Sequence, residues 1–262
     1  MRRLPQILCL SGHDPGGGAG IQADIEAIAA QGAHALSLIT ALTVQDSHNV
    51  RRRVAIEPAL LAEQLDCLLA DSPVRAIKLG LLGSAAQLPL IAATIRRCGV
   101  PVIADPVLAA GGGTALSDEA FRDQFRRELL PLITLLTPNA AEARLLSGET
   151  ETLAAARRLQ ALGCAQLLVT GGDEPDAEVR NLWLDAQGQA QEFRWPRLPA
   201  RFHGAGCTLA AAIAGRIALG ESWQEAITRA QRYTHESLAL AFAAGQGRLM
   251  AERLRPPRGG GA

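Results

Sequence analysis

Residues 7–31 read ILCLSGHDPGGGAGIQADIEAIAAQ, and the fold can be worked out from this stretch. It begins with a short apolar run, residues 7–10, as expected of a buried β-strand. It then turns through residues 12–20, a segment dominated by glycine. It continues with isoleucines spaced four and three residues apart over residues 21–28, which places them on one face of an α-helix. A strand, a glycine-rich turn and a helix in succession predict the first unit of an α/β fold.

The same alternation continues along the chain. Short apolar runs predict strands at 35–42, 51–56, 76–79, 100–104, 133–136 and 166–170, and a hairpin at 179–185 and 189–195. Helical patterns occupy 21–31, 58–70, 85–98, 118–129, 152–162, 207–219 and 223–243. Nearly continuous apolar strands that alternate with helices are typical of a parallel sheet covered on both faces. The sequence therefore predicts a three-layer αβα sandwich with a mostly parallel central sheet.

Length and composition favour a single folded domain. The chain has 262 residues, of which 48% are hydrophobic and 20% charged, so wholesale disorder is excluded. The sequence has neither a repeat of fixed period nor a low-complexity linker before its C-terminal end, which predicts one domain over residues 1–250. Residues 251–262, with their prolines and glycines, are expected to form a flexible tail.

Charge and cysteine content narrow the class of protein. The 26 basic and 26 acidic residues balance, whereas a protein that binds nucleic acid or a membrane surface would show a basic excess. Apolar runs stay shorter than the roughly 18 residues that a membrane span needs. Five widely spaced cysteines without a CxxC pair argue against a disulfide framework or a structural zinc site. These features predict a cytoplasmic protein of enzyme size.

Polar and glycine-rich segments follow the predicted strands. In parallel α/β sheets, ligands bind beyond the carboxyl ends of the strands, so these segments are expected to converge. They are residues 12–20, 45–46, 80–83, 105–113, 139–142, 171–173 and 203–207. Their convergence is the main reason to expect an enzyme.

The start of the predicted helix at residue 207 carries the strongest chemical signal. Gly204, Ala205 and Gly206 leave three consecutive backbone amides open at a helix N-terminus, where an oxyanion or a phosphate can bind. Cys207 follows at the helix start, where the helix dipole is expected to lower the pKa of its thiol. The alternative is a buried cysteine in a helix start made of small residues.

Further candidates lie at the other strand ends. The turn at 12–20 lets backbone amides approach a ligand, or needs glycine only for its own geometry. Gln45 could pair with a heterocycle through its amide donor and acceptor, and Asp24 could simply cap or solvate the first helix. Asp105 and Glu142 could hold Mg²⁺ through waters and phosphate oxygens. Their alternatives are a turn residue before a proline and a partner of the helix dipole in the first turn after a cap at Asn139.

Six blocks together resemble a known family. They are residues 11–24, 39–45, 78–82, 105–107, 136–143 and 203–208. In this order they are similar to the ribokinase-like kinases, and most closely to the hydroxymethylpyrimidine/phosphomethylpyrimidine kinases of thiamine synthesis. The resemblance covers about residues 7–245, and its first and last blocks are the most specific.

The resemblance implies a ribokinase-like fold, a homodimer and ATP-dependent phosphorylation with Mg²⁺. The expected substrate is 4-amino-5-hydroxymethyl-2-methylpyrimidine, whose monophosphate is then phosphorylated to the diphosphate. By the same resemblance, the pyrimidine site would be lined by Gly12, Asp24, Val44, Gln45 and Leu81, with Gln45 at the aminopyrimidine edge. Metal ligands would be Asp105 and Glu142, and the ATP phosphates would be contacted by Asn139, Thr170, Gly172 and Thr208.

The resemblance also gives roles to the helix start. Gly204, Ala205 and Gly206 would form the anion hole for the transferring phosphoryl group. Cys207 stands where sugar kinases of the wider superfamily have an aspartate general base. A base must take the proton of the alcohol acceptor, whereas a phosphate acceptor is already ionised at neutral pH. We therefore expect Cys207 to matter less in the second phosphorylation.

The sequence departs from the family at three places. Thr170 precedes the Gly-Gly pair where the family often has a lysine, and residues 109–112 lack the lysine common in that loop. An arginine, Mg²⁺ or a monovalent cation must then neutralise more of the phosphate charge. Leu81 replaces a common methionine of similar volume.

Three other interpretations compete with the leading one. A pyridoxal kinase would act on a similar ring, but Gln45 and the first block favour the pyrimidine. A non-catalytic nucleotide- or vitamin-binding protein of the same fold is disfavoured by the presence of Asp105, Glu142 and Cys207 together. A dinucleotide-dependent dehydrogenase is disfavoured because this sequence has no Asp or Glu at a clear ribose-binding strand end after the first glycine-rich turn.

Overall fold

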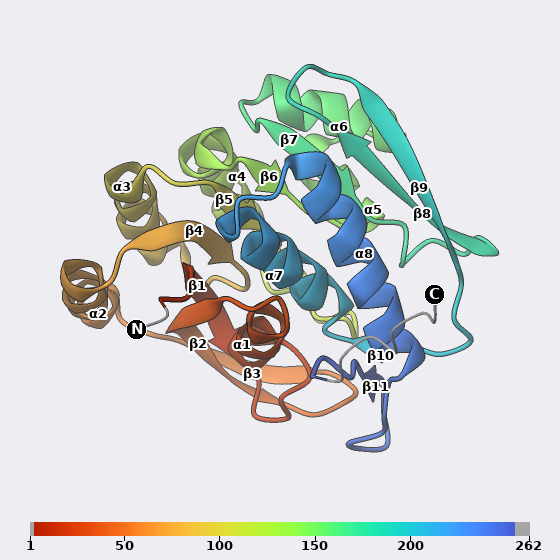
Figure 1. Ribbon diagram of the computed structural model, residues 1–262, viewed down its shortest axis with the longest axis horizontal. Helices are drawn as coiled ribbons and strands as arrows, with labels where there is room; N and C mark the ends of the chain where they lie inside the picture. The colour runs from red at the N-terminus through yellow and green to blue at the C-terminus, as the bar shows by residue number, and fades with distance from the viewer. Residues whose placement is uncertain (1–2, 255–262) are drawn as a thin grey trace.

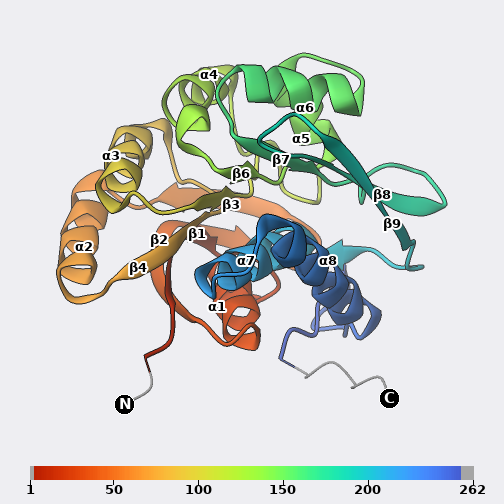
Figure 2. The same cartoon turned by 45° about the horizontal axis from the view of Figure 1, so that its top comes forward.

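The first strand explains why the sheet lies inside the molecule. Strand β1 (Gln6–His13) is buried along its interior on both faces, so both faces of its sheet need cover. The computed structural model, which describes residues 3–254, supplies that cover with a layer of helices on each side (Figures 1 and 2). The predicted three-layer αβα sandwich is confirmed.

The main sheet is mixed but parallel at its centre. Its strand order is β3-β2-β1-β4-β5-β6-β7-β8-β9, and β3, β8 and β9 run antiparallel to their neighbours. A second, two-stranded sheet pairs β10 with β11. The remaining strands are β2 (His34–Gln45), β3 (Val50–Ala55), β4 (Val74–Leu79), β5 (Val102–Ala104), β6 (Leu135–Leu136), β7 (Gln166–Val169), β8 (Glu178–Leu184), β9 (Ala190–Pro196), β10 (Phe202–His203) and β11 (Leu249–Met250).

The helices form two separate apolar layers. One core cluster joins α1, α7 and α8 to one face of the sheet, and the other joins α2 to α6 to the opposite face (Figure 1). The helices are α1 (Gly20–Ala30), α2 (Pro58–Asp71), α3 (Leu88–Cys98), α4 (Glu119–Glu128), α5 (Ala140–Ser147), α6 (Thr152–Ala161), α7 (Ala205–Ala218) and α8 (Trp223–Ala239), with 3₁₀ turns η1 (Ala85–Gln87) and η2 (Leu130–Leu132). Among residues 3–254, the structure contains no helix that is both long and apolar enough to cross a membrane.

The central helix α7 owes its position to its small residues. It is buried along most of its length and is built mainly of alanine, so its backbone lies close to α1 and to the strands β4 and β5. Its N-terminus therefore reaches the carboxyl edge of the sheet, where β1, β5 and β6 also end. The fold thus brings the predicted helix start at Cys207 to the predicted ligand-binding edge.

The structure corrects the sequence analysis at the C-terminal end. Residues 251–254 belong to the folded part, because Ala251 and Arg253 are each only 2% exposed. The prediction of a flexible tail is therefore wrong for residues 251–254. Residues 255–262 lie outside the described residues. Helix α8 also ends at Ala239, four residues before its predicted end. The chain beyond it turns back to form β11.

Candidate active site

An open cavity of about 820 Å³ runs along the carboxyl edge of the sheet. The loops after β1, β2, β5, β6 and β7 and the start of α7 line it. Most of the predicted site residues meet there: Gly12, Gln45, Leu81, Asp105, Asn139, Glu142, Thr170, Gly172, Gly204, Ala205, Gly206 and Cys207. Three predicted residues, Asp24, Val44 and Thr208, do not line the cavity.

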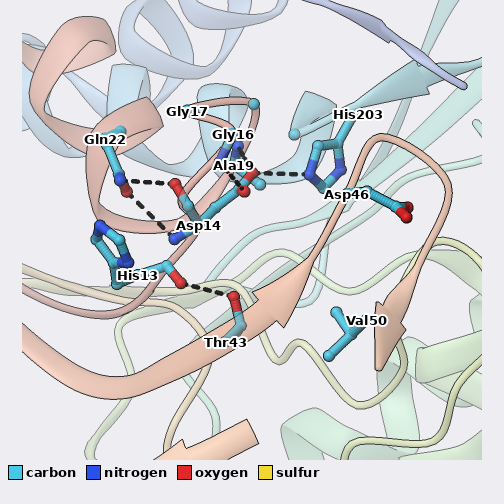
Figure 3. A network of polar contacts seen from close by, with 12 residues as sticks. His13, Asp14, Gly16, Gly17, Ala19, Gln22, Thr43, Asp46, Val50 and His203 are labelled. Carbon is cyan, nitrogen blue, oxygen red and sulfur yellow. Dashed lines mark hydrogen bonds and ion pairs between the residues drawn. The ribbon is translucent and has the colours of Figure 1, made fainter. Parts of the chain in front are cut away.

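The glycine-rich loop is held by one carboxylate. Asp14 accepts hydrogen bonds from the backbone amides of Gly16 (2.8 Å) and Ala19 (2.9 Å), and its Oδ2 lies 2.9 Å from His203 Nε2. Figure 3 shows His203 reaching across to this loop from the segment before α7. The Gln22 amide donates to the Asp14 carbonyl oxygen at 2.6 Å. The loop is therefore ordered by Asp14 and is tied to the start of α7.

The environment of Asp14 keeps it ionised. Burial alone would raise its pKa, but hydrogen bonds to His203, to Gln45 and to the Gly16 amide lower the pKa to about 2. Gln45 lies close enough to Asp14 to affect that pKa, and it lines the cavity. The sequence analysis expected the segments 12–20 and 203–207 to converge but gave no role to Asp14 or His203, which join them.

Glycine is required where this loop meets α7. Gly204 adopts φ +77°, and a Cβ there would lie 1.9 Å from the Gly18 carbonyl oxygen. Gly204 is also the N-cap of α7 and has no side chain with which to cap it. The glycine-rich loop and the predicted anion hole are thus in direct backbone contact.

A buried ion pair lies beneath the cavity. The Lys78 ammonium is fully buried, 2.7 Å from Asp24 Oδ1 and 3.1 Å from Ser11 Oγ. Burial would lower the pKa of Lys78, but the Asp24 carboxylate raises it, so the lysine stays charged. Asp24, expected to line the pyrimidine site, is thus occupied by Lys78 and Ser11 and does not reach the cavity. The sequence does offer one signal for this pair, which the sequence analysis did not use: Lys78 is the only lysine of the chain and lies in an apolar strand.

Cys207 is buried, with 9% of its surface exposed. Burial and the neighbouring Asp105 raise the pKa of its thiol to about 12, while the Lys78 charge opposes this shift. The predicted lowering of the thiol pKa is therefore wrong, because burial and a nearby carboxylate outweigh the favourable charges. The Asp105 carboxylate lies close enough to the thiol for each group to shift the pKa of the other.

The two carboxylates predicted to bind metal influence each other. Asp105 and Glu142 are 6% and 8% exposed. Burial and the Asp105 charge raise the pKa of Glu142 to about 8, and burial also raises the pKa of Asp105. Two such carboxylates at a cavity wall fit a divalent cation, whose charge would relieve their repulsion. Within residues 3–254, no group of three or more His, Cys, Asp or Glu side chains could hold a metal ion. Mg²⁺ is commonly held by one or two carboxylates together with waters and phosphate oxygens, which is the set that Asp105 and Glu142 could complete.

Glu142 and Asn139 also have structural roles. Asn139 Oδ1 accepts from the Glu142 amide (2.8 Å), and Glu142 Oε2 accepts from the Asn139 amide (3.0 Å), forming a capping box at the start of α5. Asp173 accepts from the Ala141 amide at 3.0 Å. The Asn139 side chain is thus engaged with the helix, although the residue lines the cavity.

Thr208 and Val44 have other surroundings than expected. The Thr208 hydroxyl donates to the Gly204 carbonyl oxygen (2.8 Å) and accepts from Arg253 Nε (2.8 Å). It therefore supports the helix start from behind. Val44 is 46% exposed on β2, outside the cavity. The sequence analysis missed Arg253, because it assigned that residue to the tail.

Comparison with known proteins agrees with this site. The family model described as phosphomethylpyrimidine kinase matches residues 14–252. The chain belongs to this family. It is 39% identical to the hydroxymethylpyrimidine/phosphomethylpyrimidine kinase of Synechococcus elongatus, over 93% of this chain and 95% of that one. Among solved structures, a Bacillus subtilis pyridoxal kinase in complex with ADP superposes with a TM-score of 0.86 at 27% identity, covering 95% of this chain and 97% of that one.

Some relatives are longer than this chain. The thiamine biosynthesis bifunctional protein ThiED of Geobacter sulfurreducens is 38% identical over 94% of this chain. The chain spans about half of that protein, 52% of its length. What the longer proteins do as a whole therefore concerns more than the matched part.

Proposed function

We propose that this protein is an ATP-dependent kinase of 4-amino-5-hydroxymethyl-2-methylpyrimidine and of its monophosphate. The observation that carries the proposal is one cavity with two different ends. One wall has the open amides at the start of α7 beside Asp105 and Glu142, and the loop after β2 brings Gln45 to the same cavity. A phosphoryl donor and a heterocyclic acceptor can thus meet within it.

Gln45 is the group best suited to the aminopyrimidine. A primary amide offers both a donor and an acceptor, which match the amino group and the adjacent ring nitrogen of that heterocycle. The amide lies near the ionised Asp14 carboxylate, and Leu81, which lines the same cavity, offers an apolar contact to the ring. This pairing favours the pyrimidine over pyridoxal, which has no amino group beside its ring nitrogen.

Asp105 and Glu142 would hold Mg²⁺ through waters and the phosphate oxygens of ATP. When bound, the ion would neutralise negative charge on the phosphates. The amides of Ala205 and Gly206 would donate hydrogen bonds to the oxygens of the transferring phosphoryl group at the positive end of the α7 dipole. Lys78, charged beneath the cavity, adds a positive potential close to the same point.

The thiol of Cys207 completes the chemistry as a relay. The acceptor hydroxyl oxygen forms a bond to the γ-phosphorus while the bond from that phosphorus to the bridging oxygen breaks, and ADP keeps the electron pair. The hydroxyl proton passes to Cys207 Sγ as the S–H proton passes to the Asp105 carboxylate. The Asp105 carboxylate lies beside the start of α7, with Oδ2 3.4 Å from where a Cβ of Gly206 would stand, and this closeness to Cys207 supports the route.

Initial rates of ADP formation with three acceptors test the proposal. The purified protein with ATP and Mg²⁺ should turn over the hydroxymethylpyrimidine and its monophosphate, and pyridoxal much more slowly. Turnover of pyridoxal alone would instead make it a pyridoxal kinase, which the fold similarity to that enzyme favours as the second candidate. Binding of ATP without turnover of any acceptor would point to a non-catalytic binding protein.

We further propose that two copies of the chain associate through the edge of the main sheet that β2 and β3 form. Leu42 and Val54 are register partners across the two strands, and with Val44 they are 45–48% exposed. Adjacent exposed apolar side chains at a sheet edge favour association. The expected location is the cytoplasm, and the five free cysteines support a reducing compartment.

A further inference from the structure

Two arginines stand side by side at the cavity. Arg201 precedes β10 and Arg248 precedes β11, and these two short strands pair in parallel. The Leu249 amide donates to the Arg201 carbonyl oxygen at 3.0 Å, so the two side chains leave the backbone at neighbouring points. Both residues line the cavity. The second sheet therefore fixes a pair of cations at its rim.

Neither cation has an acidic partner within the part of the chain that the structure describes. No carboxylate of residues 3–254 lies within ion-pair distance of Arg201 or Arg248. Burial and the Arg201 charge both lower the pKa of Arg248, as expected of two cations close together. By contrast, Arg253 in the same segment has Glu26 at 2.9 Å. Two like charges held together beside a cavity favour binding of an anion.

The position of Arg248 assigns the pair to the acceptor end. Its backbone amide donates to the Ser47 carbonyl oxygen at 3.0 Å, two residues beyond Gln45. Its guanidinium lies against Gly111, where a Cβ would come within 1.9 Å of Nη1. A side chain at position 111 would therefore displace Arg248. The glycine of this loop leaves the room that the arginine occupies.

We infer that Arg248 and Arg201 bind the phosphate of the phosphorylated acceptor. The inference rests on the proposed function and adds a residue-level reason for its second step. The first acceptor is a neutral alcohol, whereas the second carries a phosphate with about −1.5 to −2 charges at neutral pH. A guanidinium binds phosphate through two parallel hydrogen bonds, which a hydroxymethyl group cannot match. The pair thus selects for the phosphomonoester.

Kinetics with both acceptors test the inference. Arg248→Ala should raise the KM for the pyrimidine monophosphate about tenfold or more, the effect expected when a charged hydrogen bond is lost. The ratio of kcat/KM for the second acceptor to that for the first should fall by a similar factor. Arg201→Ala should act in the same direction, and Arg248→Lys should recover part of the loss. Arg96→Ala, which removes an exposed arginine of α3, is the matched control.

Two outcomes would overturn the inference. If Arg248→Ala raised the KM for both acceptors equally, the arginine would not distinguish the phosphate. If it raised only the KM for ATP, the pair would belong to the nucleotide end. Calorimetric titration of the monophosphate without ATP gives an independent readout, in which the variant should bind at least about tenfold more weakly than the wild type. A wild type that binds the monophosphate but phosphorylates neither acceptor would refute the proposed function and leave this test valid.

Discussion

At the residue scale, Cys207 carries the sharpest consequence. Its thiol is protonated in the free protein because burial and Asp105 raise its pKa to about 12. It is therefore suited to pass a proton on rather than to act as a ready-made thiolate. A relay matters only where the acceptor has a proton to give up, which distinguishes an alcohol from an ionised phosphate.

Cys207→Ala, which removes the group that relays the proton, should therefore affect the two phosphorylations unequally. We expect kcat for the alcohol acceptor to fall about 100-fold, the lower end for loss of general acid–base catalysis, and kcat for the monophosphate to fall less than about tenfold. Quenched-flow assays of both reactions on one preparation would measure this. Equal losses in the two reactions would contradict the role given to the thiol.

A second residue-scale prediction concerns Asp14 and pH. Its native pKa of about 2 lies below the ordinary value of 3.8, so its hydrogen bonds stabilise the fold fully above about pH 4. That contribution disappears as the pH falls from about 4 to 2, since the carboxyl is then protonated in both states. Asp14→Asn should lower the free energy of unfolding at pH 7 by about 2 kcal/mol.

Urea unfolding of wild type and Asp14→Asn between pH 7 and pH 2 would test this. The difference between the two proteins should shrink through that acidic window. A difference that stayed constant with pH would mean that the Asp14 charge does not stabilise the native loop.

At the element scale, the segment 249–254 connects the elements that form the site, on the side away from the cavity. Arg253 donates from Nη2 to the Gly18 carbonyl oxygen, from Nε to Thr208 Oγ1 (2.8 Å) and from Nη1 to Glu26 (2.9 Å). It thus joins the glycine-rich loop, α1 and α7, whose parts must stay in register for the acceptor to face the anion hole. The Tyr233 hydroxyl donates to the Arg253 carbonyl oxygen at 2.9 Å and anchors the segment to α8.

Arg253→Lys should loosen this connection without removing the charge. One ammonium cannot replace the planar set of donors, so we expect a loss of about 1–3 kcal/mol in unfolding free energy. We also expect a lower kcat with both acceptors, because the loop and the helix start lose a common support. Arg229→Lys, on the exposed side of α8, serves as the control. Unchanged kcat in a destabilised protein would limit Arg253 to a structural role.

The accuracy of the sequence analysis differed between kinds of element. The strands β1, β4 and β7 were predicted from their short apolar runs, and the helix α1 from the helical spacing of its isoleucines. The strands β10 and β11 and the helix α5 were not predicted. The two strands have two residues each and the helix has eight, which is too short for a clear pattern. The strand ends were enough to predict which residues meet at the cavity.

Individual surroundings could not be predicted in the same way. Burial of Arg253 depends on contacts with residues more than 200 positions away, which local composition does not reveal. The Lys78–Asp24 pair spans 54 positions, and the raised pKa of Cys207 follows from the burial of both its neighbours and itself. The corrections for Arg253, Asp24 and Cys207 therefore share one cause, namely charge and burial supplied by distant parts of the chain.

At the scale of the whole molecule, the exposed apolar edge predicts a dimer. Val54→Glu places a charge among Leu42 and Val44, and burying it in an interface would cost several kcal/mol. We expect the variant to sediment as a monomer at concentrations where the wild type is a dimer. Glu63→Gln, on the exposed face of α2, is the control. A wild type that is monomeric at high concentration would contradict this interface.

The proposed function requires one cavity to perform two successive phosphoryl transfers. The most direct test is a time course of the purified protein with ATP, Mg²⁺ and 4-amino-5-hydroxymethyl-2-methylpyrimidine, with products resolved by mass. The monophosphate should accumulate first and then be converted to the diphosphate, with two ADP formed for each pyrimidine consumed. Product that stopped at the monophosphate in excess ATP would contradict the second transfer, and absence of any phosphorylated pyrimidine would contradict the central claim.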